Sequence, residues 1–105
     1  MIEKQKIQEA VELLKSAANP VKIILFGSYA RNDPSSESDL DFLVVEQEVE
    51  SRRSEMVRLR RILSHLRIPV DIIVVSEQVF NDWAETPGTV IYEAALEGQV
   101  VYETS

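Results

Sequence analysis

Short runs of β-branched and apolar residues alternate with amphipathic stretches along this chain, and this alternation constrains its fold more than any other feature of the sequence. Within the short runs, apolar residues follow one another without helical spacing, which predicts buried strands. Strands are predicted at residues 21–26, 39–45, 70–75 and 99–102, with the last at a sheet edge. The pattern therefore predicts an α/β fold, in which helices pack on a mixed sheet of about four strands.

Helices are predicted where apolar residues recur every three or four positions. Two such stretches cover residues 2–18 and 49–67. A third helix is predicted after Ser76, which can serve as its N-cap, with Phe80 and Trp83 directed inward. A fourth is predicted at residues 86–98, with Pro87 at its first position.

Length and composition place the chain among small globular domains. Its 105 residues fit one domain, residues 1–105, and leave no room for a second binding domain. Hydrophobic residues make up 45% and charged residues 28%, as in ordinary folded proteins. No apolar run approaches the ~20 residues that span a bilayer, and the amino terminus does not resemble a secretory signal. We therefore expect a cytoplasmic protein that does not enter membranes.

Charge and residue types narrow the possible partners and metals. The net charge of −7 argues against a nucleic-acid polymer as the main partner, because phosphate backbones are bound by Lys and Arg. A small anion can still bind locally. The chain has no cysteine, and its one histidine, His65, cannot build an imidazole metal site alone. Any bound metal is therefore expected on oxygen ligands.

Three aspartates stand out from their surroundings. Asp39 and Asp41 lie two residues apart in a predicted strand, so both carboxylates project from one face, although a solvated strand entry explains this pair equally well. Asp71 interrupts the apolar run 70–75, where burial of a carboxylate is costly unless the carboxylate has a partner. A structural alternative is that Asp71 lies at a strand edge and is hydrogen-bonded to a cap. If the two strands are neighbours, the three carboxylates meet and could bind magnesium.

Gly27 and Ser28 directly follow the predicted strand 21–26. Glycine lets backbone amides approach an anion closely, and Ser28 adds a hydroxyl donor, so this turn could hold the phosphates of a nucleoside triphosphate. Arg31, in a predicted short helical turn, either reaches the same phosphates or is a solvated surface charge. A loop is predicted at residues 32–38, which are rich in turn formers.

Together, these parts predict a site for nucleotidyl transfer. Magnesium on Asp39 and Asp41 would bridge the phosphates, and Asp71 could ligate a second metal or act as general base toward an acceptor hydroxyl. Attack at the α-phosphorus would then release pyrophosphate.

The joint pattern resembles a known family. Gly27-Ser28, ten intervening residues, Asp39-x-Asp41 and a third aspartate in the next strand are similar to the signature of the DNA polymerase β superfamily of nucleotidyltransferases. Residues 27–32 and 38–45, and the carboxy-terminal part around Trp83 and Gly98, resemble in particular its minimal nucleotidyltransferase (MNT) branch.

This resemblance implies a palm-like nucleotidyltransferase fold, with Gly27 and Ser28 on the triphosphate of an NTP, ATP foremost. It places Asp39, Asp41 and Asp71 on magnesium, with two ions possible and manganese able to substitute. Members of the branch commonly pair with a small all-helical HEPN protein as a toxin–antitoxin couple, and some add AMP to that partner. We therefore expect transfer of AMP from ATP to an acceptor on a partner protein.

One residue departs from the pattern of the branch. Asn32 stands where MNT proteins usually have glycine. Asparagine tolerates the left-handed backbone conformation better than most residues, so the turn is expected to survive.

Two other functions stay open from the sequence alone. The chain could be a non-catalytic antitoxin that occludes its partner, or the catalytic subunit of a two-chain enzyme that modifies a small molecule.

Trp83 could be an interface anchor rather than a core residue. Tyr29 could stack on a base or pack in the core, and the arginines of residues 52–61, mixed with glutamates, indicate a solvated face or a surface for an acidic partner.

Overall fold

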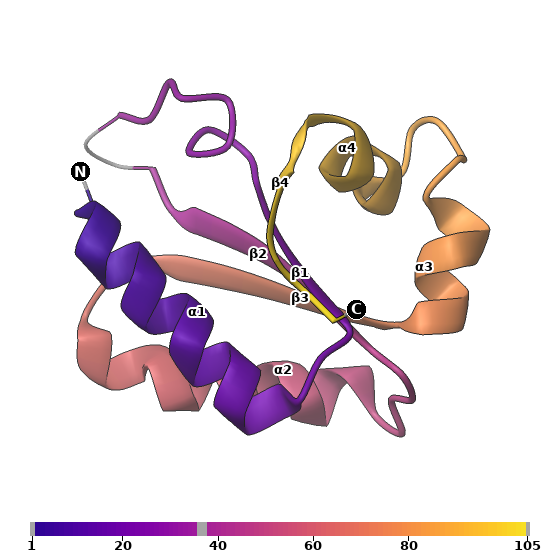
Figure 1. Cartoon of the computed structure of the whole chain (residues 1–105), viewed down its shortest axis with the longest axis horizontal. Helices are drawn as coiled ribbons and strands as arrows, with labels where there is room; N and C mark the ends of the chain where they lie inside the picture. Colours follow the sequence, from indigo (N-terminus) through magenta and orange to yellow (C-terminus); the bar gives the residue numbers. More distant parts are fainter. Residues whose placement is uncertain (1, 36–37, 105) are drawn as a thin grey trace.

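A four-stranded mixed sheet organises the chain, with the strand order β3-β2-β1-β4 (Figure 1). The computed structural model describes residues 2–35 and 38–104, so Ser36 and Glu37 of the predicted loop lie outside the described residues. β1 is antiparallel to β2 and β4, whereas β2 and β3 are parallel. The strands are β1 (Lys22–Phe26), β2 (Leu40–Glu46), β3 (Val70–Ser76) and β4 (Gln99–Glu103).

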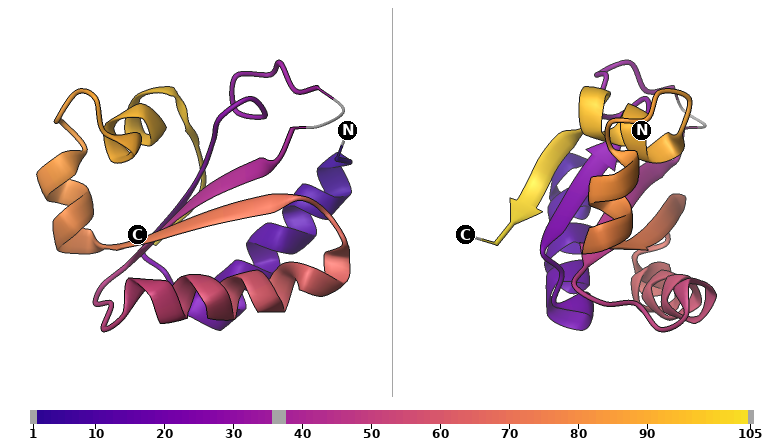
Figure 2. Two further views of the ribbon diagram at one scale, coloured as in Figure 1. Left: turned by 180° about the vertical axis from the view of Figure 1, so that it is seen from behind. Right: turned by 90° about the vertical axis from the view of Figure 1, so that its right-hand side faces the viewer.

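Helices cover both faces of this sheet (Figure 2). They are α1 (Lys4–Ala18), α2 (Arg52–Leu63) with the 3-10 turn η1 (Ser64–Leu66), α3 (Glu77–Trp83) and α4 (Val90–Glu97). On one face, α1 and α2 pack in a cluster that includes Phe42 and Ile72. On the other, α3 and α4 pack in a cluster that includes Leu43 and Val75. Burial on both faces explains why the strands have nearly continuous apolar sequences.

The sequence predicted the strands well and the helix ends less well. The edge position of β4 is confirmed, whereas β2 begins at Leu40, so Asp39 precedes the strand. α2 is shorter than the predicted helix 49–67 because the Ser51 hydroxyl accepts a hydrogen bond from the Ser54 amide at 3.3 Å and caps its start. η1 then replaces the last predicted turn.

The last helix begins later than predicted. Gly88, with a φ of +89°, lies in a turn with Pro87, and a helix cannot continue through that conformation. The Thr89 hydroxyl accepts a hydrogen bond from the Tyr92 amide at 3.0 Å, so α4 starts at Val90. None of the helices within residues 2–35 and 38–104 is long and apolar enough to cross a membrane.

The predicted inward position of Trp83 is wrong. Ser76 caps α3 as predicted, accepting a hydrogen bond from the Val79 amide at 3.2 Å, and Phe80 packs partly buried on the sheet. The helix has only seven residues, however, and Val79 and Phe80 form its contact with the sheet. Trp83, at its last position, is 47% exposed.

Candidate active site

Asp41 and Asp71 lie side by side on the neighbouring strands β2 and β3. The two residues are register partners in the parallel pair, and Asp39 lies two residues before Asp41 on the same face. Leu40 and Phe42 alternate with them and are fully buried on the face that carries α1 and α2. The three carboxylates therefore project from the opposite face, at the end of the sheet where β2 and β3 begin and β1 ends.

The carboxylates influence one another electrostatically. The pKa of Asp41 is raised, first by partial burial and then by repulsion from Asp71 and Asp39. The Arg31 guanidinium acts on the same pKa in the opposite direction. The structure thus brings all three aspartates and Arg31 close enough to interact, and a cation at this surface would relieve the repulsion.

Asp71 is more open than its apolar neighbours suggested. Because β3 is an edge strand, the Asp71 side chain remains 53% exposed, as the strand-edge alternative expected, although its partner is Arg60 rather than a cap. Its Oδ1 lies 3.4 Å from Nη2 of Arg60, which reaches it from α2. Arg60 was missed from sequence because helical periodicity does not show which α2 side chain meets the sheet edge.

Gly27 places the turn after β1 directly against Asp41. Its φ is +77°, and a Cβ at this position would overlap Oδ2 of Asp41. Only glycine therefore allows both the left-handed conformation and the close approach of this carboxylate. The turn at Gly27, directly after β1, therefore lies against Asp41 of β2.

The residues after Gly27 form a single helical turn, as predicted. The Arg31 amide donates to the Gly27 carbonyl at 3.1 Å. Asn32 adopts a φ of +62°, and its amide and that of Asp33 donate to the carbonyls of Tyr29 and Ser28 at 3.3 and 3.0 Å. This is the Schellman arrangement of a helix end, so asparagine takes the glycine position as expected.

Two residues of this turn, Ser28 and Arg31, carry groups that are available to a ligand. Within the residues that the structure describes, neither the Ser28 hydroxyl nor the Ser28 amide has a hydrogen-bond partner. The Arg31 guanidinium is half-exposed and only loosely paired, at 3.7 Å from Asp33 and 3.9 Å from Glu97. The turn therefore presents donors beside the aspartates, as an anion site requires.

The donor set suits a hard divalent cation. Carboxylate oxygens are the ligands that magnesium prefers, and a cation would neutralise the repulsion from Asp71 and Asp39 that, after burial, raises the pKa of Asp41. Among the described residues, no three His, Cys, Asp or Glu side chains are already grouped to hold one ion. Asp39 and Asp41 are the residues that could hold a metal, and Asp71 could join them once it separates from Arg60.

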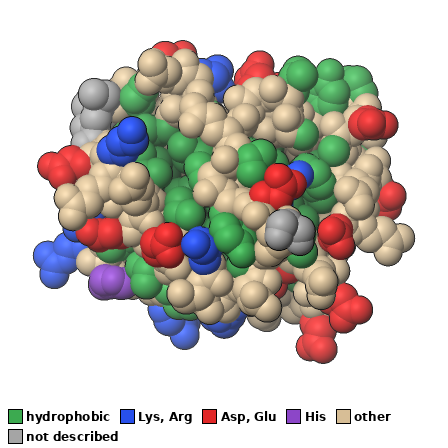
Figure 3. Space-filling view, viewed as in Figure 1, with side chains coloured by type: hydrophobic (Ala, Val, Ile, Leu, Met, Phe, Trp, Pro, Cys, Tyr) green, Lys and Arg blue, Asp and Glu red, His purple; other side chains and the backbone are tan. Residues whose placement is uncertain are grey.

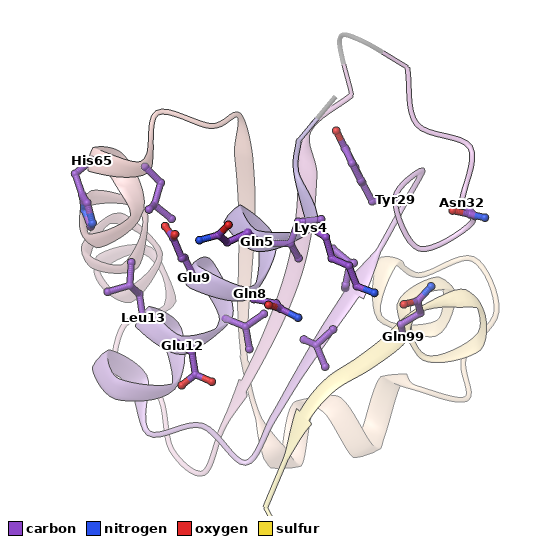
Figure 4. Close-up of a pocket in the computed structure, with 15 residues that line it drawn as sticks. Lys4, Gln5, Gln8, Glu9, Glu12, Leu13, Tyr29, Asn32, His65 and Gln99 are labelled. Carbon is purple, nitrogen blue, oxygen red and sulfur yellow. The ribbon is translucent and has the colours of Figure 1, made fainter.

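A hollow in the described surface lies elsewhere, between α1 and β4 (Figure 4). It is lined by apolar side chains such as Ile7, Val11 and Val101 together with polar ones such as Gln8 and His65, and by none of the three aspartates. Tyr29 also lines it; the ring packs on the core, and the hydroxyl accepts a hydrogen bond from the Ile2 amide at 2.8 Å. The candidate site is thus an open surface rather than this hollow.

Comparisons with known proteins identify the family of this chain. The family model described as polymerase beta, nucleotidyltransferase, matches residues 6–105. A Methanocaldococcus jannaschii protein named as a putative protein adenylyltransferase is 39% identical over 83 residues, which cover 77% of this chain and 81% of that protein. A second protein of that organism with the same description is 38% identical over 53 residues, covering 50% and 52% of the two chains.

Two solved structures share the fold. One is described as a putative nucleotidyltransferase from Sulfolobus solfataricus. The two structures align with a TM-score of 0.60 at 22% sequence identity, and the alignment covers 94% of this chain and 78% of that chain. A chain from the crystal structure of a mutant of the toxin–antitoxin MntA-HpeT has a TM-score of 0.63 at 20% identity, over 100% of this chain and 76% of its own. The family match and the identity to the first relative show that this chain belongs to the polymerase β nucleotidyltransferase family and is a nucleotidyltransferase.

Proposed function

We propose that this nucleotidyltransferase is magnesium-dependent, transfers AMP from ATP to a hydroxyl of a partner protein, and acts as the antitoxin of a pair with a small helical HEPN-type protein. The observation that carries the proposal is the register of Asp41 with Asp71, directly beside the Gly27 turn. Both sequence relatives are described as protein adenylyltransferases, and one structural neighbour comes from a toxin–antitoxin complex.

The Gly27-Ser28 turn is assigned to the triphosphate. The free Ser28 amide and hydroxyl would donate to phosphate oxygens, and Arg31 would exchange its loose pairs with Asp33 and Glu97 for the phosphates. Because Gly27 brings the turn against Asp41, phosphates held there would lie next to the carboxylates. The turn thus orients the α-phosphorus toward the face that carries Asp39 and Asp41.

Asp39 and Asp41 are assigned to metal binding and Asp71 to the acceptor side. Magnesium, with manganese as a substitute and two ions possible, would supply Lewis-acid stabilisation of charge on the phosphates. The acceptor oxygen would form a bond to the α-phosphorus as the bond to the bridging oxygen breaks and pyrophosphate leaves. Asp71 would take the hydroxyl proton or hold a second ion, after release from Arg60.

The open position of the site supports an acceptor on another chain. Asp39, just before β2, and Asp71, on the edge strand β3, are both exposed, so a large partner can reach them. We therefore favour a protein acceptor over a small molecule. The use of ATP and of a co-synthesised partner places the reaction in the cytoplasm.

One observation favours a second candidate, an antitoxin that neutralises its partner by occlusion alone. Asp71 is already paired with Arg60, and the described carboxylates are not grouped around one ion position. The two candidates differ in what the aspartates do. Occlusion needs the surface of the chain but not its carboxylate charges.

A growth assay separates these functions. The neighbouring HEPN-type gene is co-expressed with the wild-type chain, with an Asp39→Asn/Asp41→Asn variant, or with a Glu9→Gln/Glu12→Gln variant that removes two charges from α1. The transferase proposal expects the wild type and the α1 variant to restore growth and the aspartate variant to fail. Equal protection by all three, at equal protein levels, would reject catalysis as the means of neutralisation.

A further inference from the structure

The acidic charge of this chain is confined to its carboxy-terminal part. Residues 1–67 contain eleven Lys and Arg and eleven Asp and Glu, whereas residues 68–105 contain seven Asp and Glu and no Lys or Arg. The whole net charge of −7 therefore arises after Arg67. This part of the chain forms β3, α3, α4 and β4.

Four of these acids have nothing to neutralise them. Glu77, Asp82, Glu85 and Glu93 are exposed on α3, α4 and the loop between them. Within residues 2–35 and 38–104, none of the four has an ion pair or a side-chain hydrogen bond. By contrast, the glutamates Glu9, Glu12 and Glu55 each lie near a cation of their own helix.

Exposed apolar side chains gather in the same segment. Trp83 is 47%, Val90 52% and Leu96 66% exposed, and these lie at the end of α3 and along α4. Figure 3 shows an apolar patch over α4 and the preceding loop, with acidic side chains along the adjacent edge of the molecule. We call the outward side of residues 82–96 the C-terminal face.

We propose that the C-terminal face is a docking surface for a basic protein, and that this protein is the acceptor of the transferred nucleotide. The inference rests on the proposed function for the identity of the partner. Exposed apolar side chains (Trp83, Val90 and Leu96) interspersed with unpaired acids on the same two helices are the composition of a protein interface whose partner is positively charged.

The charges exclude the other occupants. A second copy of this chain would place its own unpaired acids against those of the first, and repulsion would oppose such a dimer. Nucleic acids and the surfaces of biological membranes are negatively charged and would be repelled in the same way. A basic protein is the occupant that satisfies both the acidic and the apolar side chains.

The location of the face connects docking to catalysis. α3 and α4 pack on the same side of the sheet from which Asp39, Asp41 and Asp71 project. At the end of α4, Glu97 lies 3.9 Å from Arg31 of the candidate phosphate-binding turn. A partner seated on the C-terminal face would therefore lie on the same side of the sheet as the candidate active site, next to the turn that carries Arg31.

The test measures binding of the purified HEPN-type protein encoded next to this chain, by calorimetry without ATP. Leu96→Ser removes an apolar contact, and Val57→Ser removes a comparably exposed valine from α2 as its matched control. Glu85→Gln/Glu93→Gln removes two unpaired acids, with Glu9→Gln/Glu12→Gln as its control. Thermal unfolding confirms that each variant is folded.

We expect Leu96→Ser to weaken binding by about tenfold or more and Val57→Ser to leave it unchanged. The Glu85→Gln/Glu93→Gln pair should weaken binding severalfold at low salt, with the difference vanishing near about 0.5 M salt. Wild-type affinity for both face variants would overturn the docking surface. Binding is measured without turnover. Failure of AMP transfer in a separate assay would therefore reject the proposed function, and the binding data would still show whether the C-terminal face is a docking surface.

Discussion

Asp41 of β2 and Asp71 of β3 are register partners, and the Gly27 backbone lies against the same Asp41 carboxylate. Three segments that are distant in the sequence thus meet at one point of the sheet. A change in the backbone at Gly27 should therefore disturb the Asp41 carboxylate.

Replacing Gly27 by alanine should damage both stability and activity. The substitution places a methyl group on Oδ2 of Asp41 and forces alanine into a φ of +77°, so we expect a loss of about 2–4 kcal/mol in the free energy of unfolding. Gly88→Ala is the matched control, because Gly88 has a φ of +89° but open space around it, and should lose only about 1–2 kcal/mol. Urea unfolding measures the stability of the two variants, and equal losses would show that the contact with Asp41 is unimportant.

The pKa of Asp41 should respond to its two neighbours in opposite directions. Asp71→Asn removes a repulsive charge and should lower the pKa of Asp41, whereas Arg31→Gln removes an attractive one and should raise it. Carboxyl NMR titration of the metal-free protein measures the change directly. Asp82→Asn serves as the control and should leave the pKa of Asp41 unchanged; a pKa of Asp41 insensitive to Asp71 would contradict the shared site.

Stability should fall with rising pH because of Glu46. Burial raises the pKa of Glu46 from 4.5 to about 8, and Glu55 adds a hydrogen bond and repulsion, while Oε2 of Glu46 is buried without a partner in the described chain. The folded state therefore holds a proton that the unfolded state has lost, and stability declines between pH 4.5 and about 8.

Glu46→Gln should remove this decline. Because the group is partly exposed and screened, we expect a gain of roughly 1–2 kcal/mol at pH 9 and little change near pH 4. Urea unfolding across this range measures it, with the exposed Glu48→Gln as control. An unchanged slope of stability against pH in Glu46→Gln would show that Glu46 ionises normally in the folded protein.

Removal of divalent cations should abolish transfer without unfolding the chain. Chelation should reduce the rate by about a hundredfold or more, and magnesium or manganese should restore it. Circular dichroism should stay constant, because the core clusters consist of hydrophobic residues that take no part in binding a cation. Full activity in excess chelator would refute the metal role of Asp39 and Asp41.

The sequence predicts most of this fold because both faces of the sheet are buried. Continuous apolar runs therefore mark β1, β2 and β3, and the Gly27 turn and the left-handed Asn32 follow from backbone preferences that act locally. Strand order is not local: nothing within 39–45 or 70–75 states that these strands are parallel neighbours. From the sequence, the proximity of Asp41 and Asp71 therefore depends on whether the two strands are neighbours, and the register of β2 with β3 shows that they are.

The positions of side chains on edge strands and at helix ends are not predicted by the sequence, because they depend on how the elements pack. Asp71 is exposed because β3 is an edge strand, and Arg60 reaches it from a helix whose rotation the sequence leaves open. Trp83 lies at the end of a helix too short to bury it, which favours the interface reading of this residue. Large apolar side chains predict burial only where an element is long enough to cover them.

Label transfer from ATP tests the central claim most directly. The chain is incubated with the neighbouring HEPN-type protein, magnesium and ATP labelled at the α- or the γ-phosphate, and the Asp39→Asn/Asp41→Asn variant is run in parallel. We predict that the wild type moves the α-label, but not the γ-label, onto the partner and that the variant moves neither. No α-label on the partner with the wild type, or equal labelling by the variant, would contradict a nucleotidyl transfer site built on these aspartates.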